Sequence, residues 1–298
     1  MCPDSISSDT TPEEIVYLNG RYLPISQACV PVLDRGFIFG DGVYEVIPAY
    51  GGRLFRLDEH LDRLDNSLKA IRLDNPYDRK QWETVLSTLL QQYGDSDQSV
   101  YLQITRGVAK RDHGFPPNTP ATVFAMSSKL TTPDAAMLAT GIAAISTTDS
   151  RWQNCYIKTI ALLPNILLKQ EALDREAMEA ILIRDGMVTE GTASNVFIVQ
   201  QGVIKTPPKS AQLLPGITRD LVVELAHANS QACEEIDISE AELNAADEVW
   251  ITSSMKEILP VTQLNDKAVG NGKPGPVWAK MLAIFQDYKA HLRQQSKA

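Results

Sequence analysis

The sequence predicts a mixed α/β protein of the α+β class with two domains. The chain has 298 residues, and since a domain commonly takes about 100–200 residues, this length is enough for two. Short runs of β-branched and aromatic residues bounded by turn signals predict strands, and longer segments with apolar residues at three- and four-residue spacing predict helices. The two kinds of segment do not alternate strictly, which favours an α+β arrangement over repeated βαβ units.

Two hairpins and two amphipathic helices are predicted first. Asn19-Gly20 and Gly51-Gly52 are two-residue turn signatures, and each separates two strand-like runs. Apolar stripes then predict two helices, one with Leu57, Leu61, Leu64, Leu68 and Ile71, the other with Trp82, Val85, Leu86, Leu89 and Leu90. Two strands are expected after them, at Val100 to Thr105 and Thr122 to Met126.

A polar, proline-bearing stretch at Leu130 to Asp134 marks the expected boundary between the domains. We place an interdomain linker at residues 131–135. The expected domains are a small α/β N-terminal domain at 14–130, after a polar tail at 1–13, and a larger C-terminal domain at 136–298.

The second half predicts further strands, two hairpins and three helices. Strands are expected around Gly141 to Ser146 and Tyr156 to Ile160, and Asp185-Gly186 and Gln201-Gly202 mark two successive hairpins. The expected helices lie at Ile166 to Met178, from about Thr218, and from Val277 to about Tyr288. The last expected strand lies at Glu248 to Thr252.

Composition and charge exclude several classes of function. With 28 Lys and Arg against 37 Asp and Glu the formal charge is −9, which disfavours nucleic acid or an anionic membrane as the main partner. The N-terminus has neither a basic region nor an apolar core of a signal peptide, and no apolar run of about 18 residues occurs, so we expect a cytoplasmic protein. The cysteines form no C-x-x-C pair, which argues against a disulfide framework or a zinc site and indicates reduced thiols.

Several common active-site motifs are absent from the sequence. It contains no G-x-G-x-x-G, G-x-x-x-x-G-K-[ST], H-E-x-x-H or G-x-S-x-G motif, so dinucleotide binding, nucleoside-triphosphate binding, metalloprotease and hydrolase activity lack their usual markers. The four histidines show no metal-ligand spacing, and we expect no metal site.

The segment Glu190 to Arg219 reads EGTASNVFIVQQGVIKTPPKSAQLLPGITR and resembles the signature of the fold-type IV, or class IV, pyridoxal-phosphate-dependent aminotransferases. Other blocks are similar to the same family, so that the resemblance spans nearly the whole chain: DRGFIFGDGVYE at Asp34 to Glu45, HLDRL at His60 to Leu64, and YIKTIALLPNILLKQEA at Tyr156 to Ala172. The resemblance implies an enzyme with pyridoxal 5'-phosphate as cofactor, bound mainly by the C-terminal domain. It also implies a homodimer with its site at the domain and subunit interface.

By this resemblance, Lys158 forms the Schiff base with the cofactor. An amine can form an imine only when it is unprotonated, and burial on a strand between Ile157 and Thr159 would lower the pKa of a lysine. Without the surrounding family blocks, a surface lysine would be the better interpretation, because most lysines are exposed.

The resemblance also implies how the ring and the phosphate are held. Glu190 is expected to contact the pyridine nitrogen and to keep the ring protonated, the alternative being a surface acid at a hairpin end. The helix start at Ile217 and Thr218 supplies N–H donors for the phosphate. Arg63 is expected to add a salt bridge, the alternative being a solvated helical arginine. The further cofactor-binding residues that the resemblance implies are Ser254, Leu214 and Asn195.

The segment YLQITRGVAKRDHGFPP at Tyr101 to Pro117 contains an R-x-H element, Arg111-Asp112-His113, that is similar to one in the D-amino acid aminotransferases. In that subfamily the arginine and histidine bind the substrate α-carboxylate across a dimer interface, together with a tyrosine that corresponds to Tyr44. The alternative for any isolated R-x-H is a solvated basic loop.

The predicted function is therefore transfer of the amino group of D-amino acids such as D-alanine to a 2-oxo acid such as 2-oxoglutarate, with Lys158 moving a proton between Cα of the substrate and C4' of the cofactor. A branched-chain L-amino acid aminotransferase, an (R)-amine transaminase and an aminodeoxychorismate lyase share the lysine and glutamate and stay open. More remote alternatives are a non-catalytic pyridoxal-phosphate-binding protein and a plain α+β interaction module. Two departures from the family pattern are Ala193 and Met255, which stand where small hydroxyl residues are common.

Overall fold

The computed structural model describes residues 13–294, so the expected polar tail lies outside the described residues except for Glu13. The chain divides into two compact units. Of the described residues, the first contains 13–130, Ile157–Ala161 and 292–294, and the second contains Thr131–Tyr156 and Leu162–His291. The short stretch Ile157–Ala161, which contains Lys158, therefore packs with the first unit although its neighbours in sequence belong to the second.

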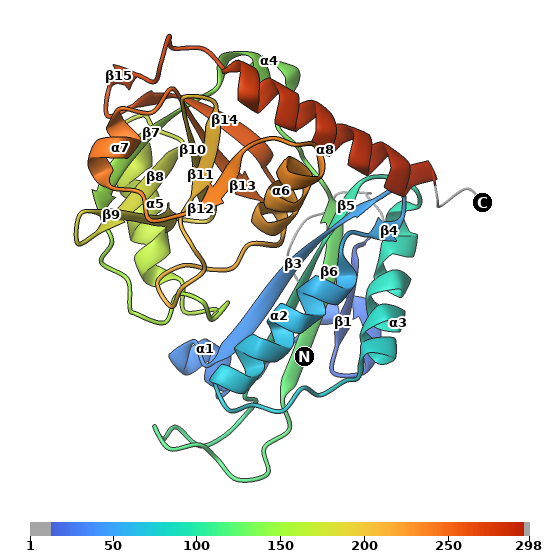
Figure 1. Ribbon diagram of the computed structural model, residues 1–298. Helices are drawn as coiled ribbons and strands as arrows, with labels where there is room; N and C mark the ends of the chain where they lie inside the picture. The colour runs from blue at the N-terminus through green and yellow to red at the C-terminus, as the bar shows by residue number, and fades with distance from the viewer. Residues whose placement is uncertain (1–12, 295–298) are drawn as a thin grey trace. The chain divides into compact units, whose positions relative to one another are not determined.

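The first unit contains a six-stranded antiparallel sheet in the order β2-β1-β6-β5-β3-β4 (Figure 1). Its two longest ladders join β5 to β3, where Gly42 pairs with Thr105 and Ala49 with Gln98, and β5 to β6, where Thr105 pairs with Thr122. The strands are β1 (Ile15–Leu18), β2 (Arg21–Pro24), β3 (Gly42–Tyr50), β4 (Arg53–Leu54), β5 (Gln98–Thr105) and β6 (Thr122–Lys129).

The α-helices that accompany this sheet are α1 (Arg35–Phe39), α2 (Leu57–Ala70) and α3 (Arg79–Leu90). The predicted leucine stripe of α2 is buried against β3, while α3 packs on β1, β5 and β6 (Figure 1). A capping box between Asp78 and Gln81 fixes the start of α3. The core between helices and sheet includes Leu61, Leu64, Trp82, Leu86 and Leu102.

The second unit is built on a nine-stranded mixed sheet in the order β12-β11-β10-β13-β14-β7-β8-β9, with β15 paired to β14 (Figure 1). The pairs β11–β12, β14–β7 and β7–β8 are parallel and the others are antiparallel. The strands are β7 (Ile142–Thr148), β8 (Glu179–Arg184), β9 (Met187–Gly191), β10 (Asn195–Gln200), β11 (Val203–Thr206), β12 (Cys233–Glu235), β13 (Glu248–Ser253), β14 (Glu257–Leu264) and β15 (Lys267–Ala268).

Helices and apolar clusters cover this second sheet. One core cluster, which includes Val196, Ile251 and Leu259, lies on β10, β13 and β14, and another packs α5 on β7 and β8 through Leu168 and Leu182. The helices are α4 (Ala135–Thr140), α5 (Leu163–Asp174), α6 (Ile217–Ala228), α7 (Glu240–Asn244) and α8 (Pro276–Gln294).

The predicted turns are confirmed, and one predicted strand is wrong. Asn19 and Gly20 both have positive φ (49° and 87°), as a type I′ hairpin requires. The strand expected at Tyr156 to Ile160 is instead an irregular segment with a single β-bridge, from Thr159 to Val43. Its backbone polar groups bond to β3 and to a side chain of α2, so a regular ladder is not needed to satisfy them.

Strand β14 is an element that the sequence did not predict. It contains Pro260, and proline is normally confined to edge strands or bulges because it has no N–H to donate. The strand nevertheless pairs on both sides, with β13 and β7, and its register with β7 shifts between Val261 and Gln263.

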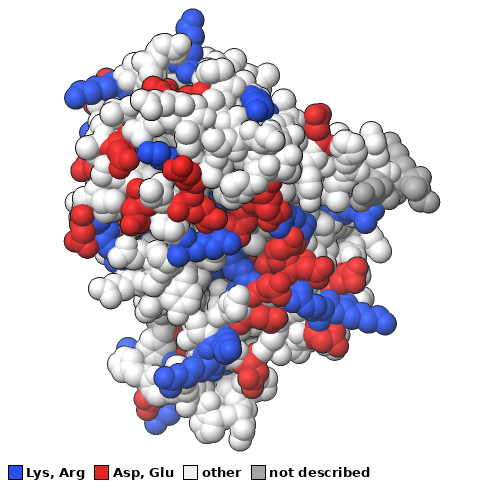
Figure 2. Space-filling model, in the orientation of Figure 1, with Lys and Arg blue, Asp and Glu red and all other residues white. Residues whose placement is uncertain are grey.

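Several further features bear on the class of protein. Cys29 is disulfide-bonded, contrary to the expectation of reduced thiols, whereas Cys155 and Cys233 carry free thiols. Among residues 13–294 no helix is long and apolar enough to cross a membrane, and no cluster of three or more potential metal ligands occurs. On the face drawn in Figure 2, acidic and basic side chains are interspersed.

Candidate active site

Lys158 lies half-buried in the first unit, over the ring of Tyr44. Its amine nitrogen is 4.2 Å from the ring centroid, which is within the range of a cation–π contact. The Tyr44 N–H donates to the Lys158 carbonyl (2.9 Å), and the Lys158 N–H donates to Ser67 Oγ (3.2 Å). Two residues predicted for the site are thus brought together by the backbone of β3.

Arg63 is buried on α2 and forms a two-pronged ion pair with Glu45 on β3. Its Nε donates to Glu45 Oε1 (2.8 Å) and its Nη2 to Glu45 Oε2 (2.7 Å). His60 Nδ1 lies 2.8 Å from the same Oε2. The alternative of a solvated helical arginine is wrong, because a carboxylate on the sheet orients the guanidinium.

Burial and charge have opposite effects within this cluster. Burial alone would raise the pKa of Glu45, but the Arg63 guanidinium outweighs it and holds that pKa well below the ordinary range. Burial lowers the pKa of His60 despite the hydrogen bond to Glu45. The cluster therefore contains an ionised Glu45, a charged Arg63 and a neutral His60 near neutral pH.

Arg111 and His113 lie on the loop between β5 and β6 and are exposed. Both contact Phe39 of α1: the Arg111 guanidinium lies 5.4 Å from its ring centroid, and the His113 ring lies 5.5 Å from it. Tyr44 instead stacks on Tyr101 at 5.7 Å.

In the second unit, Glu190 of β9 is buried and paired with Arg151, which no sequence motif indicated. Arg151 Nη1 donates to Glu190 Oε1 (2.6 Å), and the same guanidinium donates twice to Asp149 at 2.9 Å. Asp149 also accepts from Thr189 Oγ1 (3.0 Å) and pairs with Arg184 (3.0 Å). Burial raises the pKa of Glu190 to about 7 against the lowering effect of Arg151. The alternative of a surface acid is wrong.

Asn195 connects Glu190 to the start of α6. Its amide nitrogen donates to the Leu214 carbonyl (2.9 Å) and lies 3.5 Å from Glu190 Oε2, which also accepts from the Leu214 N–H (3.0 Å). Gly216 is the N-cap of α6, and a Cβ at that position would lie 1.9 Å from Asn195 Oδ1. Only glycine therefore allows Asn195 to pack directly against the helix start.

The first turn of α6 is a candidate anion site. Its N-cap, Gly216, provides no side-chain cap, and Ile217 and Thr218 are buried at its first two positions. The N–H groups of a first turn have no partners within the helix, so they suit a phosphate. Thr252 of β13, which pairs with Asn195, has a buried Oγ1 without a hydrogen-bond partner among the described residues.

Ser254 lies in the turn that follows β13, as predicted, and Lys256 fixes the same turn. Lys256 Nζ pairs with Glu179 (3.0 Å), a fully buried carboxylate that also accepts from Thr192 and Ser194. Thr252 of β13 pairs with Asn195, and Ser254 follows Thr252 by two residues. Ser254 therefore lies at the same end of the sheet as Asn195.

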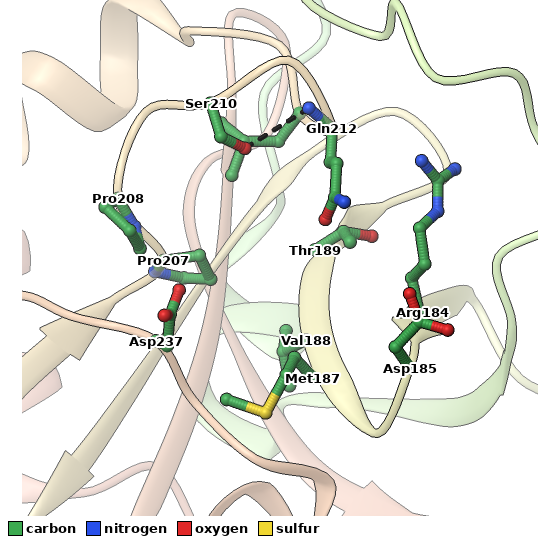
Figure 3. Close-up of a pocket in the computed structure, with 11 residues that line it drawn as sticks. Arg184, Asp185, Met187, Val188, Thr189, Pro207, Pro208, Ser210, Gln212 and Asp237 are labelled. Carbon is green, nitrogen blue, oxygen red and sulfur yellow. Dashed lines mark hydrogen bonds between the residues drawn. The ribbon is translucent and has the colours of Figure 1, made fainter.

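A pocket of about 210 Å³ in the second unit contains none of the residues predicted for the site. Arg184, Asp185, Ser210 and Gln212 line it, and Figure 3 shows Ser210 and Gln212 on one loop and Asp185 at the turn of the β8–β9 hairpin. Thr189 also lines this pocket, and its hydroxyl donates to Asp149, which pairs with Arg151 beside Glu190.

Comparison with known proteins identifies the family. The family model described as amino-transferase class IV matches residues 42–264, which include Tyr44, Arg63, Lys158, Glu190 and Ser254. The chain belongs to the class IV aminotransferases. It is thus a pyridoxal-phosphate-dependent enzyme, and the donors of the α6 turn, the amine of Lys158 and the carboxylate of Glu190 fit such a cofactor chemically.

This class IV aminotransferase is similar to known enzymes both in sequence and in structure. A D-alanine aminotransferase of Bacillus licheniformis is 41% identical over 272 residues, covering 91% of this chain and 96% of the relative. One of Staphylococcus haemolyticus is 37% identical over 274 residues, covering 92% and 97%. Among solved structures, a branched-chain amino acid aminotransferase of Escherichia coli has a TM-score of 0.88 at 26% identity, covering 93% of this chain and 94% of its own. A T.th. branched-chain amino acid aminotransferase with pyridoxamine 5'-phosphate gives the same values of TM-score, identity and coverage of both chains.

Sequence reasoning missed the residues that hold the predicted ones in place. Glu45 and His60 lie inside family-like blocks, and so a signal for them was present. Arg151 and Asp149 had none, because their two-residue spacing acquires meaning only when the chain brings them to β9.

Proposed function

We propose that this aminotransferase transfers the amino group of D-amino acids, such as D-alanine, to a 2-oxo acid such as 2-oxoglutarate. The observation that carries the proposal is the 36–41% identity to curated D-alanine aminotransferases over more than nine-tenths of the chain. The R-x-H element of Arg111 and His113 supports it, since paired basic donors suit an α-carboxylate.

Lys158 is the proposed catalytic residue, attached to the cofactor through its amine. Bound pyridoxal phosphate supplies an aldehyde that links to amines and a ring that stabilises negative charge at the substrate Cα. A Lys158 amine not bound to the cofactor would lie beside the Tyr44 ring, where it would take the proton from the substrate Cα and return it at C4'. Its backbone bonds to Tyr44 and Ser67 fix the point from which the side chain extends.

Glu190 is the proposed partner of the cofactor ring nitrogen. Its Oε1 is occupied by Arg151 and its Oε2 by the Leu214 N–H, so the carboxylate has a fixed orientation. With its pKa raised to about 7 the group can share a proton with a ring nitrogen, which keeps the ring electron-withdrawing.

The phosphate is proposed to bind the first turn of α6, at Ile217 and Thr218, together with Ser254 and Arg63. Asn195 and Leu214 complete the cofactor-binding set, because their bonds orient Glu190 and the helix start. Arg63 is oriented beforehand by Glu45, so little side-chain entropy is lost when it meets an anion.

Substrate recognition is proposed to require a homodimer. Arg111 and His113 are exposed in the single chain and would reach the site of the neighbouring subunit, where Tyr44 also contacts the α-carboxylate. Exposed apolar side chains near α1, with Phe37 77% and Val32 72% exposed, support association. We further propose that the site lies at the domain and subunit interface. The proposed domains are the N-terminal domain at 14–130 and the C-terminal domain at 136–298, joined by the linker at 131–135. The protein is proposed to be cytoplasmic, with neither nucleic acid nor a membrane as a partner.

A substrate panel tests the proposal. D-Alanine, L-leucine and (R)-1-phenylethylamine are each offered with 2-oxoglutarate, and the expected result is pyruvate from D-alanine with little product from the other two. Product from L-leucine but not from D-alanine would favour a branched-chain aminotransferase, the alternative supported by the solved structures with a TM-score of 0.88.

The attachment residue is tested separately. Borohydride treatment of the holoenzyme, digestion and mass spectrometry are expected to give one cofactor adduct, on Lys158. The Lys158→Ala variant is expected to lose turnover while some cofactor stays bound without a covalent link. A colourless protein that does not respond to added cofactor would instead favour a non-catalytic role.

A further inference from the structure

Arg35, the first residue of α1, is buried beneath the loop that carries Arg111 and His113. Its side chain is 5% exposed. Its Nη1 donates to the Asp112 carbonyl (2.6 Å) and the Gly114 carbonyl (3.3 Å), which flank His113 on both sides. One guanidinium therefore fixes the two peptide groups around the residue proposed to bind substrate.

Asp41 holds Arg35 in place from the other side. Its Oδ2 accepts from Arg35 Nε (2.7 Å) and from Arg106 Nε (2.8 Å). Arg106 in turn donates to the carbonyls of Ile71 and Arg72, at the end of α2. Burial would raise the pKa of Asp41, but the two arginines outweigh it and lower that pKa, so the carboxylate stays ionised.

The same elements close the base of the loop. The Arg35 N–H donates to the Gly107 carbonyl (2.9 Å), and Asp34 forms a β-bridge with Val108. Gly107 has a φ of +89°, and a Cβ there would lie 2.0 Å from the Pro120 carbonyl oxygen. The two ends of the loop are thus in contact, and any residue larger than glycine at position 107 would separate them.

Aromatic contacts complete the attachment. Phe115 covers the Arg106 guanidinium, which lies 3.7 Å from the ring centroid. Phe39, at the other end of α1, contacts both Arg111 and His113. The short helix α1 therefore touches the loop through its first residue and its last, while the side chains of Arg111 and His113 remain exposed.

We propose that Arg35 is a positioning residue for substrate recognition, because it fixes the backbone of the loop that presents Arg111 and His113 to the substrate carboxylate. The inference rests on the proposed function and adds to it a residue that does not touch substrate. Lysine cannot replace arginine here, since a single ammonium cannot reach the carboxylate of Asp41 and two carbonyls in the fixed geometry of the guanidinium fork.

The test compares Arg35→Lys and Asp41→Asn with Arg21→Lys, an exposed change on β2. In holoenzyme, Arg35→Lys is expected to raise KM for D-alanine about tenfold or more with kcat changed by less than about threefold, as expected for lost substrate binding. Asp41→Asn is expected to give a smaller rise in KM, because one hydrogen-bond acceptor remains. Cofactor affinity is expected to equal that of wild type in all three variants.

Hydrogen exchange measured by mass spectrometry provides a second readout that needs no activity. Peptides covering residues 108–117 are expected to exchange several-fold faster in Arg35→Lys, with β3 and β5 unchanged. Wild-type KM in Arg35→Lys overturns the proposal, as does faster exchange spread over the whole first unit, which would show a general folding role. A wild-type protein inactive on D-alanine refutes the proposed function instead, and the exchange data then still report whether Arg35 anchors the loop.

Discussion

Three parts of the proposed site in this aminotransferase are each held by a second, charged residue. Arg63 is held by Glu45, Glu190 by Arg151, and the loop of Arg111 and His113 by Arg35. Buried charges are costly when unpaired, so each pair tolerates the loss of both members better than the loss of one. Residue-scale predictions follow from that asymmetry.

The Glu45–Arg63 pair is expected to dominate the stability of the first unit. Arg63→Met leaves an ionised carboxylate fully buried, and we expect the free energy of unfolding of the apoenzyme to fall by about 3–5 kcal/mol. Urea unfolding measures it. The control Arg79→Met breaks exposed, solvent-screened pairs with Asp58 and Asp62 and is expected to leave the free energy of unfolding nearly unchanged. An Arg63→Met variant as stable as Arg79→Met would contradict the prediction.

The same pair predicts a dependence of stability on pH. Glu45 has a lowered pKa in the folded state, so the unfolded chain binds the extra proton as the pH falls. Its contribution is complete above about pH 4.3, the ordinary value for a glutamate, and is lost progressively below it. The stability difference between wild type and Glu45→Gln, measured by urea unfolding from pH 7 to pH 3, is therefore expected to shrink below that point. A difference that stays constant would show that Glu45 does not titrate as described.

At the scale of elements, glycines and caps decide where the helices begin and how closely they approach their neighbours. Gly216 opens α6 without a side-chain cap, whereas α3 starts with the capping box of Asp78 and Gln81. The first arrangement keeps N–H groups available to a ligand, and the second satisfies them within the protein. The uncapped start of α6 is the arrangement that the proposed phosphate site requires.

Gly216→Ala is expected to weaken cofactor binding. The added Cβ would overlap Asn195 Oδ1 and displace the amide that bonds to the Leu214 carbonyl. We expect a loss of about 1–3 kcal/mol of stability from the overpacking, together with a clearly higher Kd for pyridoxal phosphate in a fluorescence titration. Asp78→Ala, which removes a cap in the first unit, is expected to cost about 1 kcal/mol of stability and to leave that Kd unchanged. Equal Kd values in both variants would rule out the role given to Gly216.

At the scale of the whole molecule, exposed apolar side chains support assembly. Phe37 projects from α1 with 77% of its surface exposed, on the same short helix that contacts the loop of Arg111 and His113. A dimer would cover such side chains and place Arg111 and His113 against a neighbouring site.

Phe37→Asp is expected to shift the protein from dimer to monomer and to lower activity in proportion to the dimer lost, because a buried charge opposes association. Sedimentation velocity at several protein concentrations measures the shift, and Ile236→Asp, an exposed apolar change in the second unit, is the matched variant. Full activity from a wild-type protein that sediments as a monomer would refute the dimer requirement.

The sequence alone was enough for the family, the turns and the helices with leucine stripes, because glycine turns and residue periodicity are local properties. It also selected Lys158, Glu190, Arg63 and Thr218, through blocks of residues that a family shares. It wrongly predicted a strand at Lys158, where the segment is irregular and its backbone hydrogen bonds are made with β3 and α2. It also missed β14, because Pro260 argues against a strand that pairs on both sides. Only the tertiary structure revealed Glu45, Arg151 and Arg35 as partners. Ion pairs and hydrogen bonds between residues 18, 39 or 77 positions apart leave no local pattern, since folding alone brings such side chains together.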